Sequence, residues 1–180
     1  MSAGPRLIAI DGANGRALLL AAQRMARADG SVEGVSRWDA SGLFEQLVMA
    51  GGEASTISPR TLLLLYAADL AFRLRWEIEP ALAEGRTVVA APYVDTALAF
   101  GRACGLRAKW LDGLFRFARR PSERHVVSAP PVGARAAAGF IEFGCAHVMP
   151  QDGRATAARA RRYLNARQVS RPRRRLRRSS

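Results

Sequence analysis

Short apolar runs alternate along the chain with longer segments in which apolar residues recur every three or four positions. Residues 6–10 form the first run and lead into Asp11 and a glycine-rich turn, a pattern typical of a buried strand. Residues 87–91 are almost entirely apolar, as in strands that helices bury on both faces of a parallel sheet. Further strands are expected at residues 35–38, 124–129 and 140–149.

The segments between these runs have the apolar spacing of helices. They cover residues 16–28, 43–50, 58–84, 95–104, 109–119 and 155–165. The longest begins at Ser58-Pro59, where the missing N–H of proline costs nothing, and Pro80 is expected to kink it. Because strands and helices alternate, the pattern predicts an α/β protein with a doubly wound parallel sheet of five strands.

Basic charge is concentrated at the end of the chain. Of the net charge of +13, residues 151–180 contribute +10, with eleven arginines and a single acid, Asp152. We therefore expect one α/β domain over residues 1–165 and a disordered, arginine-rich tail over residues 166–180. Since Lys109 is the only lysine, the arginines also fit a coding bias, and the tail has three interpretations: a polyanion contact, a membrane or partner contact, or a solvated terminus.

Several classes of protein do not fit the sequence. No apolar stretch is long enough to cross a bilayer, and the first residues lack the pattern of a signal peptide, so a cytoplasmic location is expected. Cys104 and Cys145 are too few for a disulfide framework and are expected to be small buried hydrophobes. His125 and His147 have no partner at metal-binding spacing, so no metal site is predicted.

The middle of the chain resembles the thymidylate kinases, a family of P-loop nucleoside monophosphate kinases. The matching segments are residues 67–69 (AAD), 79–89 (EPALAEGRTVV) and 93–100 (YVDTALAF), which keep the family's register without gaps. Residues 8–15 (IAIDGANG) resemble the strand and phosphate-binding loop of that family. The resemblance covers roughly residues 6–135 and implies a fold of the P-loop kinase type.

This resemblance also assigns remnant site positions. Those of the phosphate loop are Asp11, Gly12, Asn14, Gly15 and Arg16, and those of the nucleoside site are Tyr66, Tyr93, Asp95 and Thr96. For Asp11 an equal alternative is that it caps the turn that follows it. Trp38 and Trp76 are expected to pack in the protein rather than to stack on bases.

The side chains that would handle phosphate are missing at the corresponding positions. A P-loop needs a lysine for the phosphates and a serine or threonine for magnesium, but the sequence has Leu18 and Leu19 there. The family's Asp-Arg pair after the third strand is Ala91-Pro92, and its glycine-rich turn after the second strand is residues 37–40, without glycines. About ten residues separate Pro131 from Phe140, so the family's arginine-rich lid is expected to be shortened or absent.

The sequence therefore favours a degenerate thymidylate-kinase-like protein that has lost phosphoryl transfer and acts as a binding or regulatory pseudoenzyme. No catalytic residue and no cofactor are assigned to it. One alternative is an active dTMP kinase with a rearranged site, which would use ATP and magnesium. Another is a nucleic-acid-associated protein that binds through its tail. The expected partners are a second copy or an active relative in a dimer, and a polyanion at Arg171, Arg173, Arg174, Arg175, Arg177 and Arg178.

Overall fold

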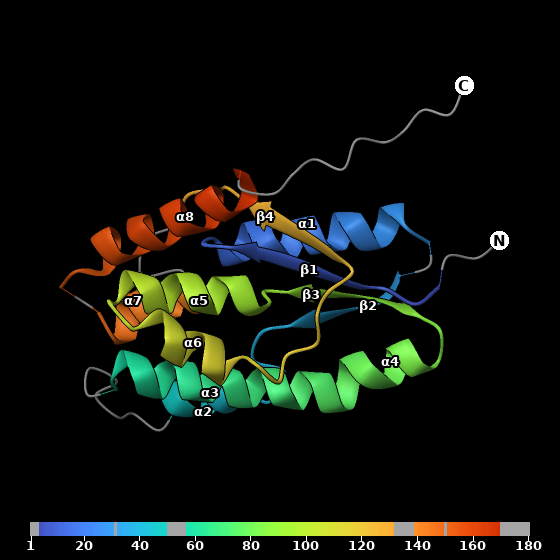
Figure 1. Cartoon of the computed structure of the whole chain (residues 1–180), viewed down its shortest axis with the longest axis horizontal. Coiled ribbons are helices and arrows are strands. Elements are labelled where there is room, and N and C mark those ends of the chain that lie inside the picture. Colours follow the sequence, from blue (N-terminus) through green and yellow to red (C-terminus); the bar gives the residue numbers. More distant parts are fainter. Residues whose placement is uncertain (1–3, 31, 50–56, 132–138, 150, 170–180) are drawn as a thin grey trace.

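Four parallel strands form the sheet of the described residues, in the order β2-β3-β1-β4 (Figure 1). The strands are β1 (Leu7–Gly12), β2 (Val32–Arg37), β3 (Thr87–Ala91) and β4 (Glu123–Val127). The structure is a computed structural model and describes residues 4–30, 32–49, 57–131, 139–149 and 151–169. Every residue of β1 and β3 is buried, as their apolar sequences predict for the central strands of a parallel sheet.

Helices cover both faces of this sheet, which confirms the predicted α/β fold. They are α1 (Gly15–Ala28), α2 (Leu43–Met49), α3 (Pro59–Arg73), the π-helical turn η2 (Leu74–Ile78), α4 (Glu79–Ala83), α5 (Val94–Ala103), α6 (Ala108–Leu114), α7 (Phe140–His147) and α8 (Gly153–Val169). On one face, Leu18 and Ala22 of α1 pack against Ile8, Ile10 and Val89. The larger cluster on the opposite face contains buried residues of α2, α3, α5, α7 and α8.

The prediction of a fifth strand at residues 140–149 is wrong, because this segment forms helix α7. All residues from Phe140 to Cys145 are buried, including the charged Glu142, so the sequence of the segment has no polar and apolar periodicity that separates a strand from a helix. At Gly144 an added Cβ would lie 2.6 Å from the ring of Phe100. The close packing of α7 against α5 therefore depends on that glycine.

A π turn interrupts the predicted long helix directly before Pro80, the residue at which a kink was expected. Ser58 caps α3 by accepting a hydrogen bond from the N–H of Thr61. The N–H of Glu79 donates to the carbonyl of Leu74, five residues back, directly before Pro80. Because Pro80 has no N–H to donate, the helical hydrogen-bond ladder is interrupted at this point in any case.

The C-terminal helix and the helix before β4 differ from their predicted bounds. Helix α8 continues to Val169, so residues 166–169 of the predicted tail are helical, while its arginines from Arg171 to Arg178 lie outside the described residues. Helix α6 ends at Leu114, five residues earlier than expected. Both cysteines are free; Cys145 is buried as expected, whereas Cys104 is only partly buried, contrary to the expectation. Within the described ranges, no helix is long and apolar enough to span a bilayer.

Phe140→Ala is expected to lower the free energy of unfolding by about 3–5 kcal/mol, because it leaves a cavity where α7 meets the core. Phe140 is 1% exposed, and its ring centroid lies 4.4 Å from that of Tyr66. Urea denaturation measures the effect. The matched control is Phe117→Ala: that ring is 48% exposed, so its loss is expected to change stability by no more than about 0.5 kcal/mol. Equal losses for both variants would contradict the placement of α7.

Candidate functional site

Asp11, at the carboxyl end of β1, is a buried cap for helix α5. Its Oδ1 accepts hydrogen bonds from the N–H groups of Tyr93 and Thr96, both at 2.9 Å, and from the Thr96 hydroxyl at 2.8 Å. The same hydroxyl oxygen accepts the N–H of Gly12 at 3.1 Å. Asp11 thus joins the end of β1 to the first turn of α5, rather than capping the turn that follows it in sequence.

The neighbouring Asp95 is held by two arginines. Its side chain is 4% exposed and forms ion pairs with Arg167 of α8 at 2.9 Å and with Arg124 of β4 at 3.6 Å. Burial, together with the charge of Asp95, raises the pKa of Asp11 to about 6, although the hydrogen bonds from Thr96 and Tyr93 partly oppose the shift. These two carboxylates therefore serve contacts within the protein.

The turn between β1 and α1 is stabilised by side chains of this chain. Asn14 caps α1: its Oδ1 accepts the N–H of Ala17 at 2.8 Å, and its Nδ2 donates to the carbonyl of Pro130 at 2.7 Å. Gly12 is required by packing, since an added Cβ would lie 2.9 Å from the carbonyl oxygen of Val127. Leu18, at the position of the family's lysine, is 2% exposed and belongs to the core between α1 and the sheet.

A carboxylate from α7 occupies the start of α1. The N–H of Gly15 donates to Oε2 of Glu142 at 3.1 Å, and Glu142 is 2% exposed. Gly139, which caps α7, packs directly on this turn: an added Cβ there would lie 2.6 Å from the Cα of Gly15. The N-terminus of a helix attracts negative charge, so Glu142 takes a position that suits a bound phosphate.

The two tyrosines assigned to the nucleoside site lie side by side in the core. The hydroxyl of Tyr66 donates to the carbonyl of Tyr93 at 2.6 Å, and that of Tyr93 donates to the carbonyl of Arg119 at 2.7 Å. Burial raises the pKa of Tyr93 to about 12 and also raises that of Tyr66, so both phenols are neutral. The rings of Phe115 and Phe140 pack on Tyr66.

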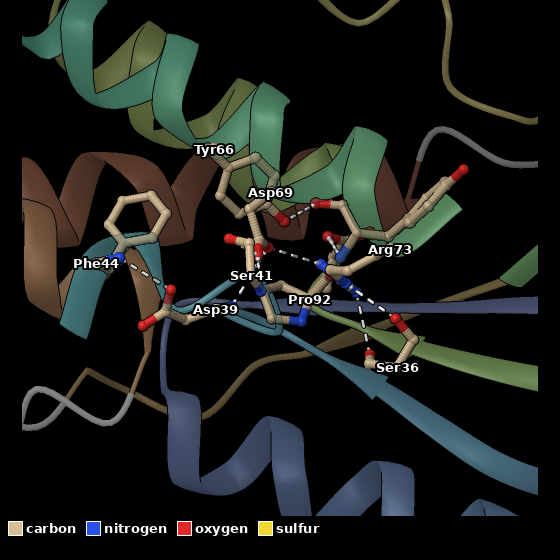
Figure 2. Close-up of polar contacts among 10 residues, drawn as sticks. Ser36, Asp39, Ser41, Phe44, Tyr66, Asp69, Arg73 and Pro92 are labelled. Atoms are coloured by element: carbon tan, nitrogen blue, oxygen red, sulfur yellow. Dashed lines mark hydrogen bonds and ion pairs between the residues drawn. The ribbon is translucent and has the colours of Figure 1, made fainter. Parts of the chain in front are cut away.

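A buried polar network lies between the end of β2 and helix α3 (Figure 2). Arg73 is fully buried; it donates to the side chain and carbonyl of Ser36, at 2.9 and 3.0 Å, and to the carbonyl of Pro92 at 2.9 Å. The carboxylate of Asp69, one turn earlier, accepts the N–H and hydroxyl of Ser41, at 3.0 and 2.8 Å. Together they fix the β2–α2 corner against the end of β3.

A cavity of about 370 Å³ opens beside this corner. It lies between the start of α1, the ends of β2 and β3, and the π turn η2. Its apolar lining includes Leu18, Leu19 and Val35, and its polar lining includes Arg37, Trp38, Asp39 and Glu77. Such crevices at the carboxyl edge of a parallel sheet are where α/β proteins bind ligands.

The predicted site residues thus fall into three groups. The first group lies at the end of β1 and consists of Asp11, Gly12, Asp95 and Thr96. The second is the pair Tyr66 and Tyr93 in the core, and the third is Asn14 and Gly15 at the start of α1. Arg16 is exposed and joins none of these contacts. Trp38 packs on Phe44 with a centroid distance of 5.0 Å, as expected, but the expectation that Trp76 packs is wrong, because it is 65% exposed.

Sequence reasoning missed Glu142, Arg73 and Glu77. The role of Glu142 could not be recognised from the sequence, because residues 140–149 were predicted to form a strand. Arg73 follows Asp69 at helical i, i+4 spacing in an otherwise apolar helix, a signal that marks a buried charge pair. Glu77 enters the cavity lining from the π turn, which the sequence does not specify beyond Pro80.

The architecture first defines the class of protein. A parallel sheet in the order β2-β3-β1-β4, flanked by helices and with a glycine-containing turn between β1 and α1, is a fold of the P-loop kinase type. The thymidylate kinase of Ehrlichia chaffeensis has this fold, with a TM-score of 0.64 and 16% sequence identity, over 93% of this chain and 82% of that one.

Sequence comparison gives the narrower relationship. A probable thymidylate kinase of Thermococcus gammatolerans is 39% identical over 84 residues, which are 44% of this chain and 40% of that protein. The thymidylate kinase of Desulfosudis oleivorans is 43% identical over 81 residues, 43% of this chain and 38% of that protein. The match therefore spans about two fifths of these relatives, and no family model matches the chain. The protein is related to the thymidylate kinases by sequence over part of its length and by fold over most of it.

Asp11→Asn is expected to flatten the pH dependence of stability between about pH 4 and pH 6. Because the pKa of Asp11 rises from 3.8 to about 6 on folding, the folded state binds this proton more tightly, and the free energy of unfolding falls as pH rises through this window. The loss is on the order of 3 kcal/mol. Urea denaturation across this range measures it, with Asp112→Asn, an exposed acid, as the control. Parallel curves for Asp11→Asn and wild type would contradict the assignment.

Proposed function

We propose that this protein is a thymidylate-kinase-like pseudoenzyme, which keeps the fold as a binding or regulatory module without phosphoryl transfer. The observation that carries the proposal is the hydrogen bond from the Gly15 N–H to the carboxylate of Glu142. A phosphate at the start of α1 would have to displace this buried carboxylate or accept a negative charge beside it. Both alternatives cost free energy.

The side chains around this turn also fit a magnesium nucleotide poorly. Leu18 and Leu19 have neither a cation for the phosphates nor a hydroxyl for the metal, and Leu18 is buried in the core. Phosphoryl transfer depends almost entirely on such electrostatic contacts. In other enzymes the loss of a single preorganised donor costs roughly 3–4 kcal/mol of transition-state stabilisation. The combined loss supports a protein without useful turnover.

An active dTMP kinase with a rearranged site is the alternative, and the names of the relatives favour it. In that case the exposed Arg16, in the first turn of α1, is the side chain at this turn that offers a positive charge. Substitution of Arg16 by Gln would then abolish the activity.

Incubation with labelled ATP, magnesium and dTMP is expected to yield no dTDP above the rate without protein. The thymidylate kinase of Desulfosudis oleivorans is the positive control. Turnover by the wild type that Arg16→Gln removes would establish the active alternative instead. Equilibrium dialysis with labelled ATP gives a second readout: no binding is expected for the wild type.

We further propose that the module pairs with a second copy of itself through an apolar stripe along α3 and η2. The stripe consists of Leu64, Ala68, Phe72 and Trp76, which recur at four-residue intervals and therefore share one face of the helix. Leu64 is 52% exposed, Phe72 39% and Trp76 65%. Such a contiguous exposed apolar face marks an interaction site.

The stripe is self-complementary. If two copies cross antiparallel at Ala68, the Leu64 of one copy meets the Phe72 of the other, as a two-fold interface requires. A small residue at the crossing point lets the two helices approach closely. This self-complementarity of the stripe favours a homodimer over an unrelated partner.

Phe72→Glu is expected to weaken self-association by at least about tenfold, because it places a charge against the apolar Leu64 of the other copy, twice in the two-fold contact. Sedimentation equilibrium of the full chain measures the dissociation constant. Phe117→Glu is the matched control, since Phe117 is exposed to 48% but lies outside the stripe. A monomeric wild type, or equal behaviour of the two variants, would rule out this interface.

A polyanion contact through the arginine-rich segment remains a prediction from the sequence, because residues 170–180 lie outside the described residues. Helix α8, which precedes the segment, carries five arginines and no acid. The cytoplasmic location likewise remains a prediction.

A further inference from the structure

The cavity between α1, β2, β3 and η2 offers one open positive and one open negative group. Arg37, the last residue of β2, is exposed and forms no ion pair with a described residue. Glu77 lines the cavity from the π turn, and its Oε2 is buried without a hydrogen-bond partner among the described residues. A buried carboxylate oxygen in this state is stabilised by any donor that a ligand brings.

The other two polar lining residues, Asp39 and Trp38, differ in whether their polar atoms already have hydrogen-bond partners. Asp39 uses both carboxylate oxygens to cap α2, accepting the N–H groups of Phe44 and Glu45, each at 2.9 Å. The indole Nε1 of Trp38, in contrast, is buried without a partner among the described residues, and it can only donate. Because this atom has almost no exposed surface and the ring packs on Phe44, Phe140 and Phe143, the groups that a ligand can pair with are Arg37 and Glu77. Arg37 needs an acceptor and Glu77 needs a donor.

This combination disfavours a phosphate. A phosphomonoester would bring close to two negative charges to a cavity that has one arginine and two carboxylates, Asp39 and Glu77. A ligand that carries one carboxylate and one ammonium group matches the open groups in number and in sign. The remaining wall, formed by Leu18, Leu19 and Val35, is apolar and accommodates a hydrocarbon side chain.

We propose that this cavity binds a free, zwitterionic amino acid with an apolar side chain. The α-carboxylate pairs with Arg37, the α-ammonium group pairs with Glu77, and the side chain lies against Leu18 and Leu19. The cavity volume of about 370 Å³ is within the range of small-molecule sites. The inference rests on the proposed function, in which the fold serves as a binding module, and it names the ligand class of that module.

Two leucines that remove phosphate chemistry have a direct role in this arrangement. Leu18 and Leu19 lie where the family resemblance expects the lysine and the hydroxyl, and they supply the apolar wall of the cavity. The same substitutions therefore disfavour a nucleotide and favour an aliphatic ligand.

The test is isothermal titration of the full chain with the individual L-amino acids at millimolar concentration. At least one of leucine, isoleucine, valine, methionine and phenylalanine is expected to bind. Its methyl ester and its N-acetyl derivative are expected not to bind, because each removes one of the two charges. Arg37→Gln and Glu77→Gln are each expected to weaken binding by at least about tenfold. Arg24→Gln, an exposed arginine of α1 outside the cavity lining, is the matched control and is expected to leave binding unchanged.

The inference is overturned if none of these amino acids binds, or if the Arg37 and Glu77 variants bind them as well as the wild type does. It is also overturned if dTMP or inorganic phosphate binds at Arg37 more tightly than every amino acid. The dTDP assay, run on the same preparation, separates the two proposals. Formation of dTDP defeats the proposed function, whereas absence of both dTDP and amino-acid binding defeats only the ligand assignment.

Discussion

The contact between Glu142 and the N–H of Gly15 is the interaction on which the rest of this site depends. It joins the first residue of α1 to α7, a helix more than a hundred residues later in the chain, and it fills the polar end of α1 from within. Because Gly139 packs on Gly15 at the same point, this arrangement is both electrostatic and steric. The aromatic cluster that α7 forms with α2 and α3 then closes the core around Phe140.

The polar side chains near the carboxyl edge of the sheet are engaged largely in contacts within the chain. Asp11 binds the start of α5, Asp95 binds two arginines, Arg73 binds two backbone carbonyls, and both core tyrosines bind carbonyls. Most of these groups have partners within the chain. Nη1 of Arg73 and Oδ1 of Asp95 are buried without a hydrogen bond among the described residues, but each forms an ion pair, with Asp69 and Arg167 respectively. In the lining of the cavity, Trp38 and Glu77 also retain buried polar atoms with no hydrogen-bond partner in the described part of the chain.

Most of the fold could be predicted from the sequence, because its elements have strong local signals. Strand β3 has the predicted bounds, and β1 and α1 begin within one residue of theirs, since apolar runs next to glycine turns and Asn14 mark their ends. Helix α7 could not be predicted, because its burial comes from surrounding helices rather than from its own pattern. At the site, the sequence has Leu18 and Leu19 where the resemblance expects a lysine and a hydroxyl, and the loss of activity that this implies stays a prediction. The contacts of Glu142 and Glu77 could not be predicted, because these residues reach the site only through tertiary packing.

The π turn at Leu74–Ile78 carries one residue more than an α-helical turn would. Since consecutive helical residues are rotated by about 100°, the segments on either side of the turn are out of phase by roughly that angle. The exposed residues Leu64 and Phe72 before the turn and the buried residues Ala81 and Leu82 after it therefore lie on faces whose relative rotation is set by the turn. A single helix can in this way present one surface outward and still deliver the chain into the central strand of the sheet.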